Sequence, residues 1–587
     1  MALIFDIETD GFQQEATKIH CLVVKDTDGG EVYTYGKPYG KGEIEEGLRF
    51  LMRTKDPIVG HNVINFDLQI IKRLYPWFEI ADDMVIDTLV LSRLIYSDLR
   101  ERDGGNVEKG LLPTKLWASH SLKAWGYRLG MLKGEYGQQE DAWDTFTPEM
   151  LEYCVRDVDV TETLYHRLLA ADYSPKAIEL EHEVASACAK MSASGWPFNA
   201  KSAADLYATL VEKRESLKRE MKETFETLVI ERISEKTGKQ LKPKIIEFNP
   251  SSRQQIGDRL IHKYGWKPKE FTPGGQPVVN EDTLRGLPYP EAEKLADYFL
   301  LEKRIGQLAE GDQAWLKLEK NGIIHGSINT NGAITGRCTH QAPNLAQVPS
   351  VRSPYGPECR GLFTVLPGFS MVGCDLSGLE LRCLAHFMSQ WDGGEYSREL
   401  LTGDIHTANQ KAAGLETRDQ AKTFIYAFLY GAGDEKIGSI VGKGRKEGGA
   451  LRKAFLEATP ALKNLRDAVG RKVKERGYLI GLDGRRLAIR SEHAALNTLL
   501  QSAGALISKQ WIVECFKELS DLRYGWAGDF TLLGYIHDEL QWAVRDEIAD
   551  AFGKRVVECA SRAGTFFDFK VPIGAEFKVG KTWADTH

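Results

Sequence analysis

Acidic side chains recur next to short apolar runs in the first part of the chain. Asp6 and Glu8 follow an apolar segment, and on a strand their side chains would point to one face. Asp67 ends a second apolar run, and Tyr153 and Asp157 lie four residues apart on a predicted helix, where they share a face. The pair of acids at the start would by itself indicate no more than an exposed acidic strand.

The four carboxylates taken together indicate a metal site. They would repel one another unless divalent cations lay among them, and their oxygen ligands suit Mg²⁺ or Mn²⁺. Two such ions about 3.5 to 4 Å apart can activate a water molecule and stabilise the leaving oxygen when a phosphodiester is cleaved. The alternative is four unrelated surface acids.

A second set of acids lies in the last third of the chain. Asp375 ends a strand-like run and is followed by a predicted helix with Glu380 in its first turn. His537, Asp538 and Glu539 join two further strand-like runs. A single buried aspartate is more often a cap or turn residue, but Asp375 and Asp538 together permit a second pair of metal ions.

A cationic and aromatic stripe lies between these acids. Arg418, Lys422, Tyr426 and Tyr430 recur every four residues before Gly431, so they drift by only about 40° per step on one helix. Two cations four residues apart repel each other slightly, and a bound triphosphate would offset that repulsion. The tyrosines could then cover a base and sugar. The alternative is a solvated cationic face with tyrosines in the core.

The pattern of strand-like and helical segments along the chain predicts a large α/β fold that would position these residues. Residues 1–175 alternate strand-like and helical patterns, and residues 176–330 form long charged helices. Strand-like runs in 331–400 and 477–587 surround a helical block at 401–476, which predicts a sheet with an inserted helical lobe. At 587 residues, we expect two or more domains.

Composition excludes several classes of protein. The nine cysteines contain no Cys-x-x-Cys pair, so they indicate neither a disulfide framework nor a structural zinc site. No run reaches the roughly 18 apolar residues of a membrane span, and we expect a cytoplasmic protein without a membrane partner. The net charge of −7 argues only weakly against nucleic-acid binding, because acids must gather wherever metal ions bind.

The order of these motifs resembles a known family. Asp375, the helix at 418–431 and the segment 537–539 resemble motifs A, B and C of DNA polymerase family A, and phrases such as GDIHT and HAALNTLLQSAGALI resemble its replicative phage branch. The N-terminal acids resemble the tyrosine subclass of DEDD exonucleases. The resemblance covers nearly the whole chain.

This resemblance implies an α/β multidomain fold, in which a ribonuclease-H-like exonuclease domain precedes a right-hand polymerase. The exonuclease domain would span 1–175 and the polymerase 176–587. Within the polymerase, the expected divisions are a thumb mainly in 176–330, a palm mainly in 331–400 and 477–587, and fingers mainly in 401–476.

The resemblance also implies roles for individual residues. Asp375 and Asp538 would hold two Mg²⁺ ions in the polymerase site. The triphosphate would be bound by Arg418, Lys422 and His406, with Lys422 also donating a proton to pyrophosphate. The incoming nucleotide and template base would meet Tyr426, Glu380 and Tyr430, with Glu380 excluding ribonucleotides. Minor-groove contacts would come from Arg337, Asn497, Gln501 and His537.

In the exonuclease domain the resemblance implies a second site for two Mg²⁺ ions. In both sites, Mn²⁺ could substitute for Mg²⁺. The metal ligands would be Asp6, Glu8, Asp67 and Asp157, and Tyr153 would orient the attacking water.

The expected partners are primer-template DNA and dNTPs, with a replicative helicase-primase left open. The phage enzyme that depends on thioredoxin carries a long thumb insertion before a segment like FNPSSR, and the short segment found here argues against thioredoxin binding. We expect a monomer acting in the cytoplasm of a phage host. The rival readings are a single-subunit RNA polymerase, a nuclease-only repair enzyme and a nonenzymatic DNA-binding scaffold.

Overall fold

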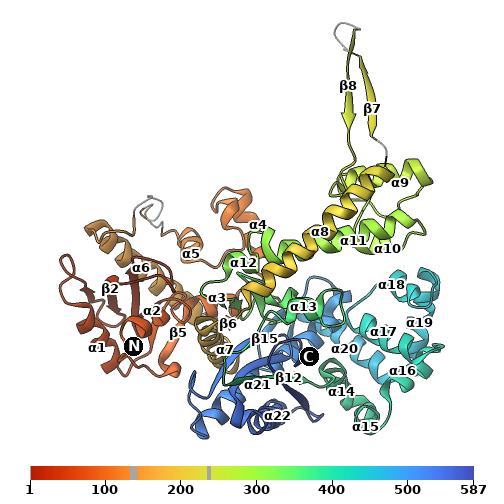
Figure 1. Ribbon diagram of the computed structural model, residues 1–587. Coiled ribbons are helices and arrows are strands. Elements are labelled where there is room, and N and C mark those ends of the chain that lie inside the picture. Colours follow the sequence, from red (N-terminus) through yellow and green to blue (C-terminus); the bar gives the residue numbers. More distant parts are fainter. Residues whose placement is uncertain (1, 132–135, 137–141, 226, 234–238) are drawn as a thin grey trace.

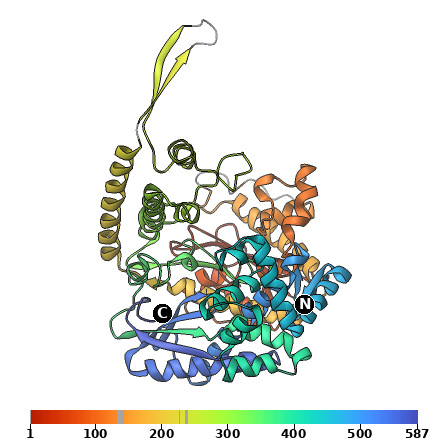
Figure 2. The same ribbon diagram turned by 90° about the vertical axis from the view of Figure 1, so that its right-hand side faces the viewer.

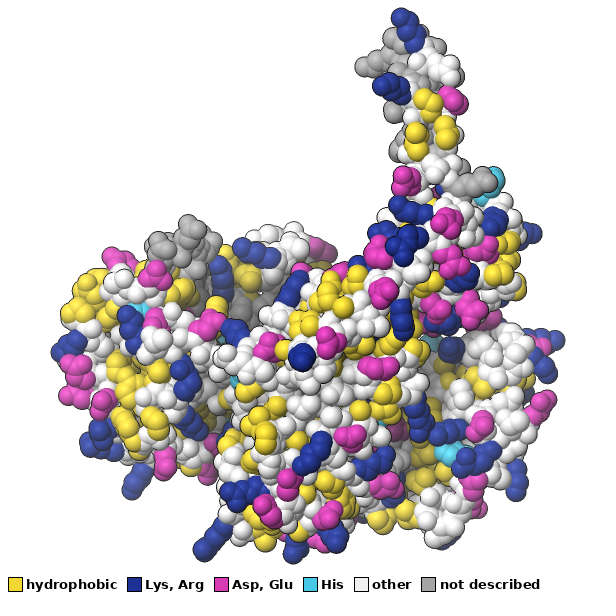
Figure 3. All heavy atoms as spheres, viewed as in Figure 1, with side chains coloured by type: hydrophobic (Ala, Val, Ile, Leu, Met, Phe, Trp, Pro, Cys, Tyr) yellow, Lys and Arg dark blue, Asp and Glu magenta, His cyan; other side chains and the backbone are white. Residues whose placement is uncertain are grey.

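A computed structural model describes residues 2–131, 136, 142–225, 227–233 and 239–587. The N-terminal part forms one lobe, and the C-terminal half forms a broad base with a helical lobe at one side (Figure 1). A long helix rises from the base and carries a two-stranded hairpin at its far end (Figure 1). On the face shown in Figure 3, basic and acidic side chains are interspersed over the lobes.

The N-terminal lobe is built on a five-stranded sheet in the order β3-β2-β1-β4-β5. The central strand β1 runs antiparallel to β2 and parallel to β4. Both faces of β1 are covered: Phe5 and Ile7 pack with helices α1 and α2, whereas Ile4 packs with α6. The strands are β1 (Leu3–Thr9), β2 (Ile19–Asp26), β3 (Val32–Tyr35), β4 (Ile58–Gly60) and β5 (Val85–Asp87). The helices are α1 (Ile44–Arg53), α2 (Asp67–Leu74), α3 (Thr88–Ile95), α4 (Leu99–Glu108), α5 (Leu122–Leu129) and α6 (Pro148–Leu169).

Helix α7 (Pro175–Ser194) packs between the N-terminal lobe and the base, and the segment after it forms the arm that stands at one edge of the molecule (Figure 2). Its longest helix, α8, pairs with α11, and its charged face is satisfied by ion pairs such as Arg214 with Glu310 at 2.9 Å and Lys222 with Glu247 at 3.0 Å. These pairs favour a solvated face for this helix. The elements are α7 (Pro175–Ser194), α8 (Ala200–Thr224), β7 (Leu228–Ile233), β8 (Gln240–Ile246), α9 (Arg253–Tyr264), α10 (Glu281–Arg285), α11 (Pro290–Ile305) and α12 (Trp315–Leu318).

The base of the molecule holds a four-stranded antiparallel sheet in the order β15-β16-β12-β17. Its core side packs against α14, α21 and α22 in the largest apolar cluster of the described chain. Trp511 and Trp542 are fully buried there, which fixes the sheet against α21. The elements are β12 (Phe369–Leu376), α14 (Leu379–Asp392), α21 (Ala495–Asp521), β15 (Phe530–Ile536), β16 (Glu539–Arg545), α22 (Ala549–Phe566) and β17 (Ala575–Gly580).

The helical lobe is inserted between β12 and α21. Its core is aromatic: Phe424 and Phe428 of α17 pack against Phe455 of α19 with ring centroids 5.1 and 5.5 Å away. The elements are α15 (Glu395–Thr402), α16 (Ile405–Ala413), α17 (Arg418–Leu429), α18 (Asp434–Ser439), α19 (Arg445–Ala458) and α20 (Pro460–Arg476). Short elements connect the parts, namely β6 (Trp196–Pro197), β9 (Ile323–Ile324), β10 (Ser327–Asn329), β11 (Thr339–Gln341), α13 (Gly356–Arg360), β13 (Tyr478–Ile480) and β14 (Arg486–Ala488).

The nine cysteines are all buried free thiols. In the part of the chain that the structure describes, no helix combines the length and apolar character needed to cross a membrane.

Two candidate active sites

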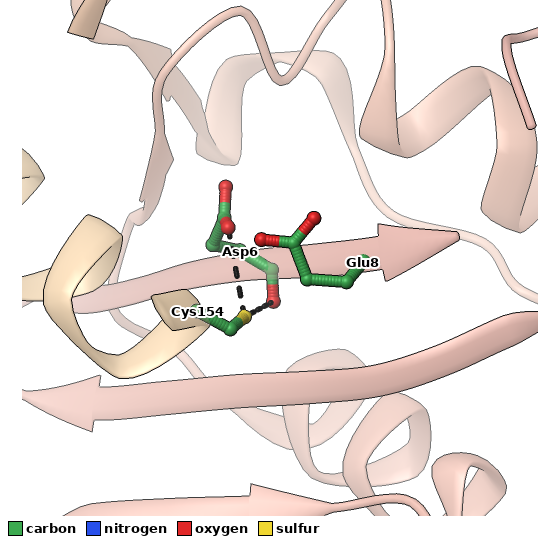
Figure 4. A group of neighbouring side chains, drawn as sticks. All are labelled: Asp6, Glu8 and Cys154. Atoms are coloured by element: carbon green, nitrogen blue, oxygen red, sulfur yellow. Dashed lines mark hydrogen bonds between the residues drawn. The ribbon is translucent and has the colours of Figure 1, made fainter. Parts of the chain in front are cut away.

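The first site lies on β1 in the N-terminal sheet. Asp6 and Glu8 project to the side of the strand that faces α6, where the Cys154 thiol lies (Figure 4). The Cys154 sulfur is 3.5 Å from both the backbone oxygen and Oδ2 of Asp6, so the thiol donates to this acid. Ligand atoms of the three residues lie within 4.8 Å of one another. The strand period therefore brings the first two predicted ligands together.

The third acid enters from α2, which begins at Asp67. Its Oδ1 accepts a hydrogen bond from the backbone N–H of Ile7 at 3.3 Å, so it lies beside β1. Burial, with the charges of Asp87 and Asp157 close by, raises the pKa of Asp67 to about 7. A divalent cation would offset exactly this kind of repulsion between buried carboxylates, so the donor set fits the predicted metal ions.

Helix α6 supplies the remaining predicted residues. Asp157 is buried one turn after Cys154 and faces Asp67 closely enough to raise its pKa. The Tyr153 ring lies 5.9 Å from the ring of Tyr136 and 6.0 Å from that of Trp143, so it belongs to an aromatic group at this end of the lobe.

Sequence reasoning missed two residues near this site. Cys154 sits between the predicted Tyr153 and Asp157 on α6, and its place three residues before Asp157 was a signal that it shares their face. Asp87 ends the short strand β5 and is fully buried. A buried acid at the end of a strand beside other acids has no distinctive local pattern.

The second site lies on the sheet of the base. Asp375 lies directly opposite Glu539 across β12 and β16, and Asp538 occupies the turn before β16. The backbone N–H of Leu376 donates to the Asp538 backbone oxygen at 3.1 Å, which brings the two predicted ligands together. Burial and the charge of Glu539 raise the pKa of Asp375 to about 6, and burial and Asp375 raise that of Asp538 to about 7. This repulsion from neighbouring carboxylates fits a site for divalent cations.

Glu539 has a different environment from its two neighbours. It is buried and accepts hydrogen bonds from Trp583 at 2.5 Å and from Gln541 at 2.7 Å, and it pairs with His587 at 3.3 Å. Burial acts to raise its pKa, but the contact with His587 and the charge of Arg360 keep the pKa below its ordinary value. The side chain therefore anchors the C-terminal residues to the sheet, a role that its sequence context did not indicate.

Helix α17 carries the predicted cationic stripe. Thr417 caps its N-terminus with Gln420, and the helix ends at Leu429, so Tyr430 is the first residue beyond it. Arg418 is paired with Asp404, whose Oδ2 lies 2.8 Å from its Nε. The structure therefore supplies an anion for the first cation of the stripe, a partner that the sequence pattern did not identify.

Two other predicted nucleotide contacts, Glu380 and His406, lie near this stripe. The Tyr430 hydroxyl donates to Glu380 at 2.8 Å, which connects the end of α17 to the start of α14. The His406 ring lies 6.4 Å from that of Tyr426. These contacts bring together side chains from α14, α16 and α17.

The four predicted DNA contacts fall into two groups. Arg337 and His537 line one cavity together with Asp538, and His537 adopts a left-handed backbone conformation with φ 60°. Asn497 donates to the Leu429 backbone oxygen at 2.6 Å, which ties α21 to the end of α17. Gln501 follows one turn later on α21, where its side chain is half-buried.

The raised pKa values predict how the base site responds to pH. Asp375 and Asp538 must lose their protons to bind a cation, and protons compete with metal below pKa values of about 6 and 7. We expect the Mg²⁺ concentration that gives half-maximal primer extension to rise as the pH falls from 8 to 6, mostly below pH 7, by about ten-fold in total for a carboxylate whose pKa is about 7 and by about two-fold for one whose pKa is about 6. Titrations of Mg²⁺ at fixed pH test this, and a half-maximal concentration that stays constant over this range would contradict it.

Comparison with known proteins assigns the chain to a family. The model of DNA polymerase family A matches residues 211–585, and the model of the RNase_H superfamily matches residues 3–169. The chain belongs to DNA polymerase family A. The chain is 40% identical to the DNA-directed DNA polymerase of Enterobacteria phage T3 and 39% identical to that of Escherichia phage T7, and each alignment covers 100% of both chains.

A solved structure agrees with this assignment at the level of the fold. The POL domain of Pol1 from M. smegmatis, in complex with DNA primer-template and dNTP, matches with a TM-score of 0.75 at 18% identity. The match covers 99% of this family A polymerase and 96% of that chain. The predicted fold class is confirmed: an RNase H-like domain precedes a family A polymerase.

The family also decides between the functional alternatives. This family A polymerase is a DNA-directed DNA polymerase of the kind found in phages T3 and T7, with an exonuclease-type domain, and it acts on primer-template DNA and dNTPs. Polymerases of this family with nuclease-like domains use divalent metals. The RNA polymerase, nuclease-only and scaffold readings have no support.

The phage T3 relative carries segments that have no counterpart in this polymerase. The alignment with the phage T3 enzyme runs over 708 positions, whereas this chain has 587 residues. Only the hairpin β7–β8 and its flanks lie between α8 and α9 here.

Proposed function

We propose that the polymerase runs two separate two-metal sites, one for synthesis on the base sheet and one for 3′ to 5′ proofreading on β1. The observation that carries this proposal is that each site gathers carboxylates whose pKa values rise to about 6 or 7 through desolvation and repulsion from neighbouring carboxylates. Each group lies where sequence motifs of a metal-dependent enzyme place it.

The proposed domains follow the positions of these sites. The exonuclease domain comprises 1–175 and the polymerase 176–587. Within the polymerase, the thumb lies mainly in 176–330, the palm mainly in 331–400 and 477–587, and the fingers mainly in 401–476.

In the synthesis site, Asp375 and Asp538 would hold two Mg²⁺ ions, or Mn²⁺ in their place. When bound, the ions would supply Lewis acidity that lowers the pKa of the primer 3′ hydroxyl and positive charge that offsets the charge of the triphosphate. Arg418, Lys422 and His406 bind the β and γ phosphates, and Lys422 protonates the leaving pyrophosphate. Arg418 exchanges the carboxylate of Asp404 for a phosphate.

The remaining contacts select the nucleotide and test the base pair. Tyr426 packs on the incoming base and sugar, Tyr430 lies near the template base, and Glu380 occupies the space that a 2′ hydroxyl would need. The minor groove, where correct pairs present similar acceptors, is contacted by Arg337, Asn497, Gln501 and His537.

In the proofreading site, the chain binds the 3′ end of DNA beside β1. The two metal ions would be held by Asp6, Glu8, Asp67 and Asp157. Tyr153 orients the attacking water, and its place on α6 one turn before Asp157 supports that role.

Further partners belong to the same proposal. The short hairpin segment argues against thioredoxin binding, and we propose that the protein acts as a monomer in the cytoplasm of a phage host. A replicative helicase-primase is a candidate partner.

Two parallel reactions test the two-site proposal. One contains a labelled primer-template with Mg²⁺ and four dNTPs, and the other is the same mixture without dNTPs. We expect extension in the first reaction and 3′ shortening in the second. Shortening in both reactions would contradict the proposed synthesis site. Extension without any shortening would contradict the proposed proofreading site.

Glu380→Ala tests the proposed exclusion of ribonucleotides. Loss of the carboxylate opens space beside the sugar, so we expect the ratio of kcat/KM for a ribonucleotide to that for a deoxynucleotide to rise by at least about ten-fold. Tyr430→Phe removes the 2.8 Å hydrogen bond to this carboxylate and the contact with Arg337 but keeps Glu380 itself, and it serves as the matched control with a smaller rise. An unchanged ratio in Glu380→Ala would show that Glu380 does not face the sugar.

A further inference from the structure

His182 makes a polar contact from helix α7 into the N-terminal domain. Its Nδ1 lies 2.8 Å from the Ile178 backbone oxygen, so this nitrogen carries the proton and donates. The other ring nitrogen, Nε2, therefore accepts a hydrogen bond from the backbone N–H of Asp87 at 3.0 Å. Both contacts together require the neutral ring, which agrees with burial lowering the pKa of His182.

Asp87 in turn holds the loop that leads to a proposed metal ligand. Its buried carboxylate accepts hydrogen bonds from the backbone N–H groups of Asn62 at 2.9 Å and Ile64 at 3.1 Å. Asn62 has a φ of 65°, in the left-handed region that asparagine adopts more readily than most residues. The same loop runs into α2 at Asp67. Asp87 therefore holds the backbone that leads into Asp67.

Helix α7 is itself held by the polymerase part of the chain. Glu181, next to His182, is fully buried and accepts hydrogen bonds from Lys509 of α21 and from Arg485 at 2.8 Å. Consecutive helix residues point about 100° apart, so Glu181 faces the polymerase core while His182 faces the N-terminal domain. Breaking a buried ion pair leaves an uncompensated charge, which makes this attachment of α7 costly to move.

We infer that His182 is a positioning residue of the exonuclease centre, supplied by a helix that the polymerase core holds in place. It acts through Asp87 on the loop that carries Asp67. The inference rests on the proposed exonuclease function. It implies that the centre is completed by a residue outside the segment 3–169 that matches the RNase_H superfamily.

Full-length His182→Ala and His182→Gln variants test this inference. Changes in groups that orient metal ligands typically cost about ten- to a hundred-fold in metal affinity or activity. We expect His182→Ala to slow Mg²⁺-dependent excision of single-stranded DNA by at least about ten-fold and to raise the Mg²⁺ concentration for half-maximal excision. Primer extension should be unchanged. His182→Gln should restore excision, because its amide oxygen can accept the hydrogen bond from Asp87.

Two further measurements separate positioning from general damage. The His182 ring borders a cavity between β5, α7 and α21, so its removal enlarges an existing space, and we expect the fold to persist. Hydrogen exchange of the 60–67 segment should be faster in His182→Ala than in the wild type. The inference would be overturned if His182→Ala showed wild-type excision and wild-type hydrogen exchange. It would also be overturned if His182→Gln excised as slowly as His182→Ala, or if primer extension fell in parallel with excision.

Asp6→Ala with Glu8→Ala, assayed in parallel, distinguishes this inference from the proposed function. Loss of excision in that double variant assigns excision to the β1 centre, and the His182 variants then report on positioning within it. Excision that survives in the double variant would overturn the proposed centre, and the inference with it.

Discussion

Asp375→Ala and Asp538→Ala should each lower primer extension by about a thousand-fold or more, while 3′ excision continues at the wild-type rate. Each change removes a carboxylate that holds a metal ion, and an ion of this kind contributes several kcal/mol to stabilising the transition state. Single-turnover extension with Mg²⁺ and one correct dNTP measures the loss.

Excision by the same preparations provides the folding control for these variants. Asp550→Ala, which removes an exposed acid from α22, is the matched substitution and should extend primers normally. Residual extension within ten-fold of the wild type in either palm variant would show that its carboxylate does not hold a required ion.

Asp6→Ala combined with Glu8→Ala should have the opposite effect. Excision of a labelled 3′ end should fall by about a thousand-fold or more, because both acids on β1 are proposed metal ligands. Primer extension should proceed at the wild-type rate, and more of the extended products should retain mismatched 3′ ends. Gel assays of excision on single-stranded DNA and of extension on primer-template measure the two effects separately.

Glu79→Ala removes an exposed acid from the same lobe and should leave both activities intact. Equal loss of extension and excision in the double variant, or in either palm variant, would contradict the existence of two independent sites. The two sets of variants together therefore test the separation as well as each site.

Local patterns in the chain predicted much of both sites. The two-residue period of a strand predicts that Asp6 and Glu8 share a face, and β1 presents them together. Spacing also predicted the helix that begins at Arg418, and the apolar runs predicted that Asp375 and Asp538 each lie at the end of a strand. These relations depend on backbone geometry over a few residues, so they can be read before the fold is known.

Other contacts could not be read in this way, because they join side chains that are distant in the sequence. Asp404 pairs with Arg418, and Glu539 binds the C-terminal His587. Hydrogen bonds of this kind depend on the path of the whole chain, and an isolated aspartate or glutamate carries no local mark of its eventual partner. The roles of these residues appeared only in the structure.

The sequence by itself determined the α/β class, the order of the exonuclease-type and polymerase parts and the acids that we propose as metal ligands. Only the tertiary structure decided how far burial raises the pKa values of Asp67, Asp375 and Asp538, and that His182 of α7 contacts the exonuclease domain. The reason is that a strand or helix period is a property of a short segment. Desolvation and repulsion between carboxylates arise only when packing removes water from several segments at once.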